Sequence, residues 1–135
     1  MWARNIQKGL LDEAKKAALK YQACFGKGNY YLELQAHGIP EQKSINTGLL
    51  ALHKETGIPL VCTNDAHYLR KEDSEMHDVL LCIQTGKTLD DENRMRFETE
   101  EFYLKSEEEL LALFPGHQEA LDNTAKIAER CNVEF

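Results

Sequence analysis

Several classes of site are excluded by what this 135-residue sequence lacks. Its four cysteines form no C-x-x-C pair, and each lies within an apolar pattern, so we interpret them as small core residues instead of zinc ligands or disulfide partners. These cysteines are Cys24, Cys62, Cys82 and Cys131. No apolar run approaches the ~20 residues that cross a bilayer, and the first residues do not resemble a signal peptide. We therefore expect a cytoplasmic chain without a membrane partner.

Phosphate-binding and nucleophile motifs are also missing. The sequence contains no G-x-x-x-x-G-K-[ST], G-x-G-x-x-G, G-x-S-x-G or H-E-x-x-H. The usual motifs for nucleotide binding and for serine hydrolases are therefore missing. Positive charge is scarce, because 16 Lys and Arg against 23 Asp and Glu give a net charge of −7. Such a surface repels phosphate, so any contact with DNA requires a local basic patch.

The first half of the chain has the pattern of an α/β protein, and its length fits one domain. Apolar residues recur at close to helical spacing over residues 5–24, which predicts one amphipathic helix. Residues 30–34 and 58–63 have the apolar and aromatic content of buried strands. Between them, Pro40 suits a helix start and Gly57 a helix stop. Strand, helix and strand make a βαβ unit, whose two strands run parallel.

Helices follow in the second half. A third helix is predicted after Leu69, with Gly86 beyond its end. Its apolar residues, Met76, Val79, Leu80 and Ile83, share one face. Ser106 and Glu109 fit a capping box that opens a short helix. A last helix over residues 118–130 is predicted to bury a further apolar set, Leu121, Ile127, Ala128 and Cys131.

The connection over residues 87–102 is polar and lacks a clear period. Arg94 and Arg96 lie there beside Met95 and Phe97, an arrangement that fits either a nucleic-acid contact or a solvated loop held by two apolar anchors. We favour the loop, because the neighbouring glutamates offset the positive charge.

Three polar residues follow the two predicted strands. His37 comes just after the first, and Asp65 and His67 come just after the second. The carboxyl ends of parallel strands share one edge of a sheet, so the three side chains are expected to converge there. Carboxylate and imidazole together suit zinc, manganese or iron. Taken alone, the D-x-H spacing fits a polar turn better; the position of His37 makes a metal site an equal alternative.

The remaining histidines are less persuasive. His53 and His77 fall within predicted helices and are interpreted as partly buried or surface positions. His117 follows Pro115 and Gly116 near a helix start and is expected to be exposed.

Three long stretches together resemble a known family. They are "YYLELQAHGIPEQKSIN", "GIPLVCTNDAHYLRKEDSEMHDVLLCIQTGKTL" and "MRFETEEFYLKSEEEL", in that order, and the likeness continues to "ALDNTAKIAERCNV". The chain closely resembles the polymerase and histidinol phosphatase (PHP) domain of bacterial replicative DNA polymerase III alpha subunits, which are DNA-directed nucleotidyltransferases. Nearly the whole chain takes part in the resemblance.

The resemblance implies a fold and a chemistry. The fold is a distorted (β/α)7 barrel of parallel strands with flanking helices and a metal cluster at the carboxyl ends of the strands. His37 matches the histidine after the "LELQ" strand, and Asp65 and His67 match the closing D-x-H of the metal-binding set. Up to three divalent ions, zinc, manganese or iron, serve phosphoester hydrolysis in such sites. In polymerase alpha subunits this is a 3′–5′ exonuclease or, where ligands are lost, a structural platform.

The chain also departs from the family. It lacks the opening H-x-H motif, the next metal ligands and the catalytic aspartates of the polymerase, so by itself it is expected to be inactive and to hold metal weakly or not at all. The resemblance makes residues 1–100 the C-terminal half of a PHP domain and residues 101–135 a short helical link toward the palm. Met1 before a helix typical of a protein interior fits an excised segment.

Partners follow from the same resemblance. They are the rest of the polymerase chain, replisome subunits and, in the intact protein, DNA. Half a barrel also leaves strand edges unpaired, so we predict that the isolated chain is marginally stable or self-associates.

Overall fold

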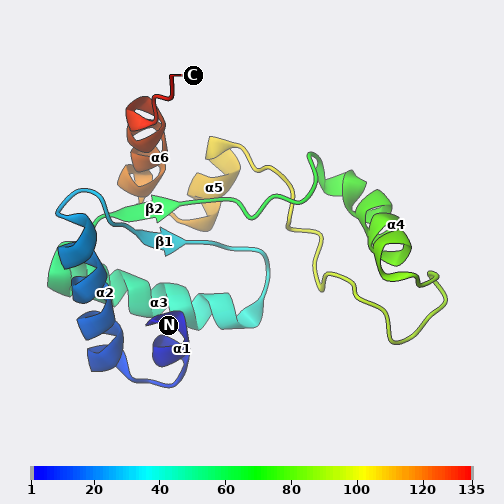
Figure 1. Cartoon of the computed structure of the whole chain (residues 1–135), viewed down its shortest axis with the longest axis horizontal. Helices are drawn as coiled ribbons and strands as arrows, with labels where there is room; N and C mark the ends of the chain where they lie inside the picture. Colours follow the sequence, from blue (N-terminus) through cyan, green and yellow to red (C-terminus); the bar gives the residue numbers. More distant parts are fainter. Residues whose placement is uncertain (1, 135) are drawn as a thin grey trace.

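The computed structural model describes residues 2–134 and the side chains of residues 5–134 (Figure 1). The interpretation of Met1 lies outside the described residues. In chain order the elements are α1 (Trp2–Gln7), α2 (Leu11–Phe25), β1 (Leu32–Leu34), α3 (Pro40–Thr56), β2 (Leu60–Cys62), the 3-10 turn η1 (Lys71–Asp73), α4 (Ser74–Thr85), α5 (Glu107–Leu113) and α6 (Gln118–Arg130). No helix in this described range is both long and apolar enough to span a membrane.

Strands β1 and β2 pair in parallel, with Leu32 opposite Leu60 and Leu34 opposite Cys62. This confirms the predicted βαβ unit and is compatible with the α/β class. The strands are shorter than residues 30–34 and 58–63, because β1 takes only the last three residues of the first stretch and β2 only Leu60–Cys62 of the second. Within residues 2–134 the sheet has two strands and does not close a barrel.

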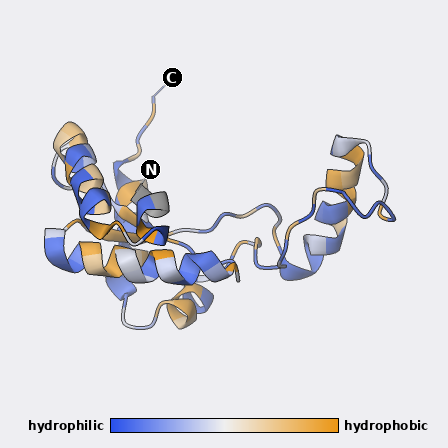
Figure 2. Ribbon diagram, turned by 90° about the horizontal axis from the view of Figure 1, so that it is seen from below, coloured by the Kyte–Doolittle hydropathy of each residue, from blue (hydrophilic) through white to orange (hydrophobic). Residues whose placement is uncertain are grey.

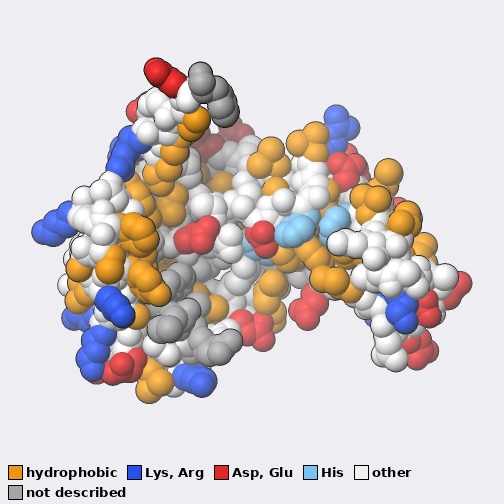
Figure 3. Space-filling model, in the orientation of Figure 1, with side chains coloured by type: hydrophobic (Ala, Val, Ile, Leu, Met, Phe, Trp, Pro, Cys, Tyr) orange, Lys and Arg blue, Asp and Glu red, His pale blue; other side chains and the backbone are white. Residues whose placement is uncertain are grey.

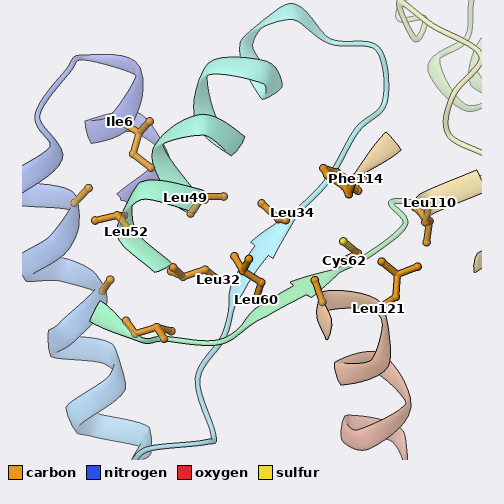
Figure 4. Packing of buried hydrophobic residues seen from close by; sticks show 14 residues of the cluster. Ile6, Leu32, Leu34, Leu49, Leu52, Leu60, Cys62, Leu110, Phe114 and Leu121 are labelled. Carbon is orange, nitrogen blue, oxygen red and sulfur yellow. The ribbon is translucent and has the colours of Figure 1, made fainter. Parts of the chain in front are cut away.

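The core lies around this small sheet (Figure 4). Leu32, Leu34, Leu49 and Ile58 are fully buried, and each such side chain contributes about 1.5–3 kcal/mol. Helix α3 packs against β1, and α6 packs against β2. Asn123 of α6 donates its side-chain N–H to the backbone oxygen of Leu60 at 2.8 Å. Helices α5 and α6 therefore share the core of the sheet, while a domain boundary at residue 100 stays a prediction.

The prediction of one helix over residues 5–24 is wrong. The chain forms α1 and α2, which are separated by a turn at Gly9 with a φ of 71°. Glycine adopts this left-handed conformation without the steric cost of a side chain. The turn allows α1 to pack back onto α3, where Ile6 lies against Gly48. A Cβ atom at Gly48 would lie 2.4 Å from Cγ2 of Ile6, so only glycine fits that position unless Ile6 moves.

The C-terminal helices form where the sequence pattern predicts them, but some residues that were predicted to be buried are exposed. The predicted capping box is confirmed, because Ser106 and Glu109 exchange backbone-to-side-chain hydrogen bonds of 2.8 and 3.3 Å. In α6, Leu121 is buried as predicted. Burial of Ile127, Ala128 and Cys131 is wrong: Ile127 is half-buried and the other two are exposed. Their part of the helix extends past the end of the short strands.

The interpretation of the cysteines holds for two of the four. Cys62 and Cys82 are buried, whereas Cys24 and Cys131 are exposed. The two exposed residues lie at helix ends, Cys24 in the last turn of α2 and Cys131 just after α6, beyond the reach of the two-stranded sheet.

Helix α4 and the connection that returns from it, residues 70–101, stand apart from the sheet and are called the α4 lobe below (Figure 2). Leu81 and Cys82 are its buried residues on the inner side of the helix. The predicted apolar face, by contrast, is exposed. The returning connection covers the inner side of α4, and no described residue packs over the outer side.

Candidate functional site

The carboxyl ends of β1 and β2 bring two of the predicted residues together. Leu34 and Cys62 are partners at the ends of the parallel strands, and His37 and Asp65 each follow three residues later. The backbone N–H of Asp65 donates to Nε2 of His37 at 3.1 Å. The structure therefore brings the loops after both strands together at one edge of the sheet, through the ring of His37 and the backbone of Asp65; convergence of all three side chains stays a prediction. Metal binding by these residues stays a prediction.

His37 is the buried member of the site. Its side chain stacks on Phe102 with ring centroids 4.9 Å apart. Gln42 accepts the backbone N–H of His37 at 2.7 Å, and the amide nitrogen of the same side chain lies 2.9 Å from Nδ1. Nε2 of His37 accepts the N–H of Asp65, and a neutral imidazole accepts at only one nitrogen, so the neutral ring carries its proton on Nδ1, beside the side chain of Gln42. Burial lowers the pKa of His37, and the charge of Lys105 lowers it further, which favours the neutral ring.

Asp65 and His67 lie at the surface beside each other. Nδ1 of His67 is 2.8 Å from the backbone oxygen of Asp65, and a carbonyl only accepts, so Nδ1 carries the proton. The lone pair of neutral His67 is then on Nε2, as in histidines that bind metal through that atom. The carboxylate of Asp65 lies 4.0 Å from Nδ1 of His67. The side chains are 53% and 36% exposed respectively, so the pair is open to solvent.

An extended segment over residues 99–105 holds this loop in place. The backbone oxygen of Phe102 accepts the N–H of His67 at 2.8 Å, and Tyr68 forms an isolated parallel bridge with Tyr103. Thr99 donates its hydroxyl to the backbone oxygen of His37. The segment reaches the loops after both strands, so it fixes their relative position.

Lys105 supplies a buried positive charge to the same segment. Its ammonium group donates to the backbone oxygen of Glu101, lies 3.4 Å from the Glu101 carboxylate, and sits 4.2 Å above the ring of Tyr103. Lys71 binds the same carboxylate at 2.5 Å. The two lysines lower the pKa of Glu101, with the Lys71 hydrogen bond as the larger cause. This network ties the start of the α4 lobe to its end.

His77 belongs to the site although the sequence pattern did not single it out. Its ring lies 5.7 Å from that of His67 and 4.8 Å from that of Phe97, and Phe97 in turn packs on Phe102. Burial lowers the pKa of His77, and His67 lowers it further. Histidine side chains lie between the α4 lobe and the part of the molecule that contains the sheet (Figure 3). The sequence shows only that α4 begins shortly after the D-x-H turn; no local pattern gives the direction in which the helix leaves that turn.

The structure decides between the two interpretations of Arg94. Its side chain is 8% exposed, and its guanidinium forms two hydrogen bonds with the carboxylate of Asp78, one of them 2.8 Å long. Arg94 is therefore a structural part of the α4 lobe. Phe97 is the anchor that was predicted, but Met95 is 59% exposed and is not. Arg96 is exposed and lines a cavity of about 270 Å³ next to His77.

The donor set at this edge is incomplete for a metal ion. Within the described part of the chain, no three His, Cys, Asp or Glu side chains lie close enough to hold one. Asp65 offers carboxylate oxygens and His67 offers Nε2, a donor pair that fits zinc, manganese or iron. His37 fits only if its contact with the Asp65 N–H opens. Ligands from outside these residues would have to complete the site.

Comparisons with known proteins give consistent matches. No family model matches the chain. Among curated proteins, it is 50% identical over 130 residues to the DNA polymerase III subunit alpha of Treponema pallidum, and 44% identical over 129 residues to that of Borreliella burgdorferi. It is 48% identical over 133 residues to the same subunit of Deinococcus radiodurans. Each match covers 96% of this chain but only 10–11% of the relative, so the chain spans about a tenth of the length of these relatives.

Proposed function

We propose that the chain is a segment of a DNA polymerase III alpha subunit that acts in DNA replication and carries part of a PHP-type metal site. The site consists of His37, Asp65 and His67, and the remaining ligands come from parts of the polymerase outside this chain. The observation that supports the metal site is the hydrogen bond from Nδ1 of His67 to the backbone oxygen of Asp65, which leaves Nε2 of His67 as the nitrogen that can bind a metal ion. The segment would form part of a (β/α)7 barrel.

The chemistry proposed for the intact domain is phosphoester hydrolysis of the 3′–5′ exonuclease type. A bound divalent ion would supply an activated water, whose pKa can fall to about 7. The residues of this chain would help to hold the ion. Asp65 would contribute negative charge, and His67 would contribute Nε2 of an imidazole ring that its backbone hydrogen bond keeps in one tautomer. Phe97 and Phe102 support the ring of His67 from its sides, with centroids at 4.6 and 5.7 Å.

The test uses a polymerase segment extended to the complete domain. Its bound metal is measured by elemental mass spectrometry, and its nuclease activity is measured on single-stranded DNA. We expect His67→Ala to lose metal and activity together, and the control His117→Ala, far from the D-x-H loop in sequence, to keep both. Equal metal content and equal activity in the two variants would contradict the proposal.

A second candidate is a metal-free structural module, and the contacts of His37 favour it. The side chain is buried, its Nε2 accepts the N–H of Asp65, and its Nδ1 lies 2.9 Å from the side-chain nitrogen of Gln42, so both ring nitrogens already have protein neighbours. In this view the three polar residues hold the loops after β1 and β2 for packing within the polymerase. An equal loss of melting temperature in Asp65→Ala with and without a chelator would favour it over the metal site.

The partners proposed for the longer protein are the rest of the polymerase chain, other replisome subunits and DNA, in the cytoplasm. Arg96 is the one exposed arginine of the connection once Arg94 is paired with Asp78. Its neighbours Glu98 and Glu100 line the same cavity, so this surface is a poor phosphate site. DNA contact is therefore proposed for the polymerase and not for this connection.

A further inference from the structure

The outer side of α4 carries a stripe of apolar side chains that none of residues 5–134 covers. Met76 and Ile83 are each 71% exposed, Leu80 is 59% exposed and Val79 is 41% exposed. Their spacing of three and four residues places them along one side of the helix. Figure 3 shows hydrophobic side chains over this part of the molecule. Single exposed apolar residues are ordinary, but a continuous stripe of this kind marks an interaction site.

The orientation of α4 is fixed by contacts on its opposite side. Leu81 and Cys82 are buried, and Asp78 binds the nearly buried guanidinium of Arg94. His77 packs against Phe97. The helix cannot turn its stripe inward without breaking these contacts. The exposed stripe is thus a stable feature of the lobe.

Charges around the stripe indicate what covers it. Glu72, Asp73 and Glu75 lie at its N-terminal end, and Lys87 lies just past its C-terminal end. The α4 lobe as a whole contains ten acidic and five basic residues, a net charge of −5. Complementary charge favours a partner with lysine or arginine beside its apolar residues.

A second copy of the chain fits less well. Two lobes of the same negative charge repel each other, and an antiparallel pairing of two α4 helices offers only Lys87 to the acidic end of the partner. Exposed apolar side chains on a helix can instead receive the apolar face of another helix.

We infer that the outer face of α4 docks an amphipathic helix of another polypeptide segment, whose apolar stripe is flanked by lysine and arginine. The surface lies on the opposite side of α4 from the contacts with Arg94. The inference goes beyond the proposed metal site, because none of its four apolar residues belongs to that site.

The probe is a labelled synthetic helical peptide of about 18 residues made of leucine and lysine, and its match replaces every lysine by glutamate. Binding to the whole 135-residue chain is measured by fluorescence anisotropy. We expect the lysine peptide to bind about tenfold more tightly or better, and to weaken several-fold between roughly 0.05 and 0.5 M NaCl. The double variant Met76→Gln, Ile83→Gln is expected to weaken binding about tenfold. The control Val133→Gln, which changes an equally exposed apolar residue outside α4, is expected to bind as before.

Backbone amide shifts measured by NMR locate the peptide and show that each variant is folded. We expect changes to centre on residues 72–87. Equal affinity for the two peptides, equal loss in both variants, or shifts elsewhere would overturn the inference. Sedimentation tests whether a second copy of the chain covers the stripe instead. A dimer that the Met76 and Ile83 substitutions dissociate would overturn the inference in favour of a second copy.

Discussion

Replacing Asp78 by asparagine is expected to loosen the α4 lobe while leaving the sheet intact. The change removes the charge that pairs with Arg94, whose side chain is only 8% exposed, while that of Asp78 is 30% exposed. Exposed ion pairs are worth about 0–1 kcal/mol, whereas breaking a buried pair costs about 3–5 kcal/mol. This pair lies between those limits. We therefore expect a loss of about 2 kcal/mol.

Hydrogen exchange shows where this loss falls. The α4 lobe meets the rest of the chain through the rings around His67, the bond of Thr99 to His37 and the pair of Glu101 with Lys105, so it can open without unfolding the core. A loss of 2 kcal/mol corresponds to about 30-fold faster exchange of α4 amides. Amides of β1, β2 and α3 are expected to exchange at unchanged rates, since they do not depend on this pair.

The effect has a predictable pH dependence. The hydrogen bond from Arg94 lowers the pKa of Asp78 in the folded protein below its ordinary value. A lowered carboxyl pKa stabilises the fold fully above the unfolded pKa, and the stabilisation disappears as the pH falls through the folded pKa. After correction for intrinsic exchange, native and variant proteins should differ by a constant factor above about pH 5 and converge below about pH 4.

The matched control is Asp90→Asn, which removes an exposed carboxylate from the same lobe. It is expected to leave α4 exchange unchanged. If the two variants exchange alike, the Arg94 pair does not hold the lobe. If β1 and β2 amides lose protection as much as those of α4, the lobe is not an independently opening unit.

Three further outcomes are expected. Gly48→Ala alone should destabilise the chain, because the new Cβ would lie 2.4 Å from Ile6. In an Ile6→Ala background the same change should stabilise the chain by about 1 kcal/mol through helix propensity. Urea titration of the native chain, the two single variants and the double variant measures both effects. Thiol alkylation at pH 8 followed by mass spectrometry should modify exposed Cys131 quickly and buried Cys62 slowly, because burial raises the pKa of Cys62 to about 11; equal rates would contradict the core position. Ser106→Ala should cost about 1 kcal/mol of thermal stability by removing a helix cap, and an unchanged melting temperature would show that the cap is not needed.

Part of the candidate site was predictable because it depends on a rule of chain connection. Strand, helix and strand with short links make parallel neighbours, so the residues after both strands share an edge. His37 and Asp65 meet there, 28 residues apart in the chain. The role of His77 was not predictable in this way. Its position beside His67 depends on the direction in which α4 leaves the turn, which no local pattern specifies.

The sequence by itself determined the features that nearby residues control. Pro40 and Gly57 bound α3 because proline suits a first helical turn and glycine accepts the left-handed cap, and Ser106 caps α5 through its own side chain. The tertiary structure alone decided the position of His77 beside His67, the pairing of Arg94 and the exposure of the apolar face of α4. Each of these depends on which distant or returning segment occupies the space beside the residue, and helical periodicity specifies a face without specifying what covers it.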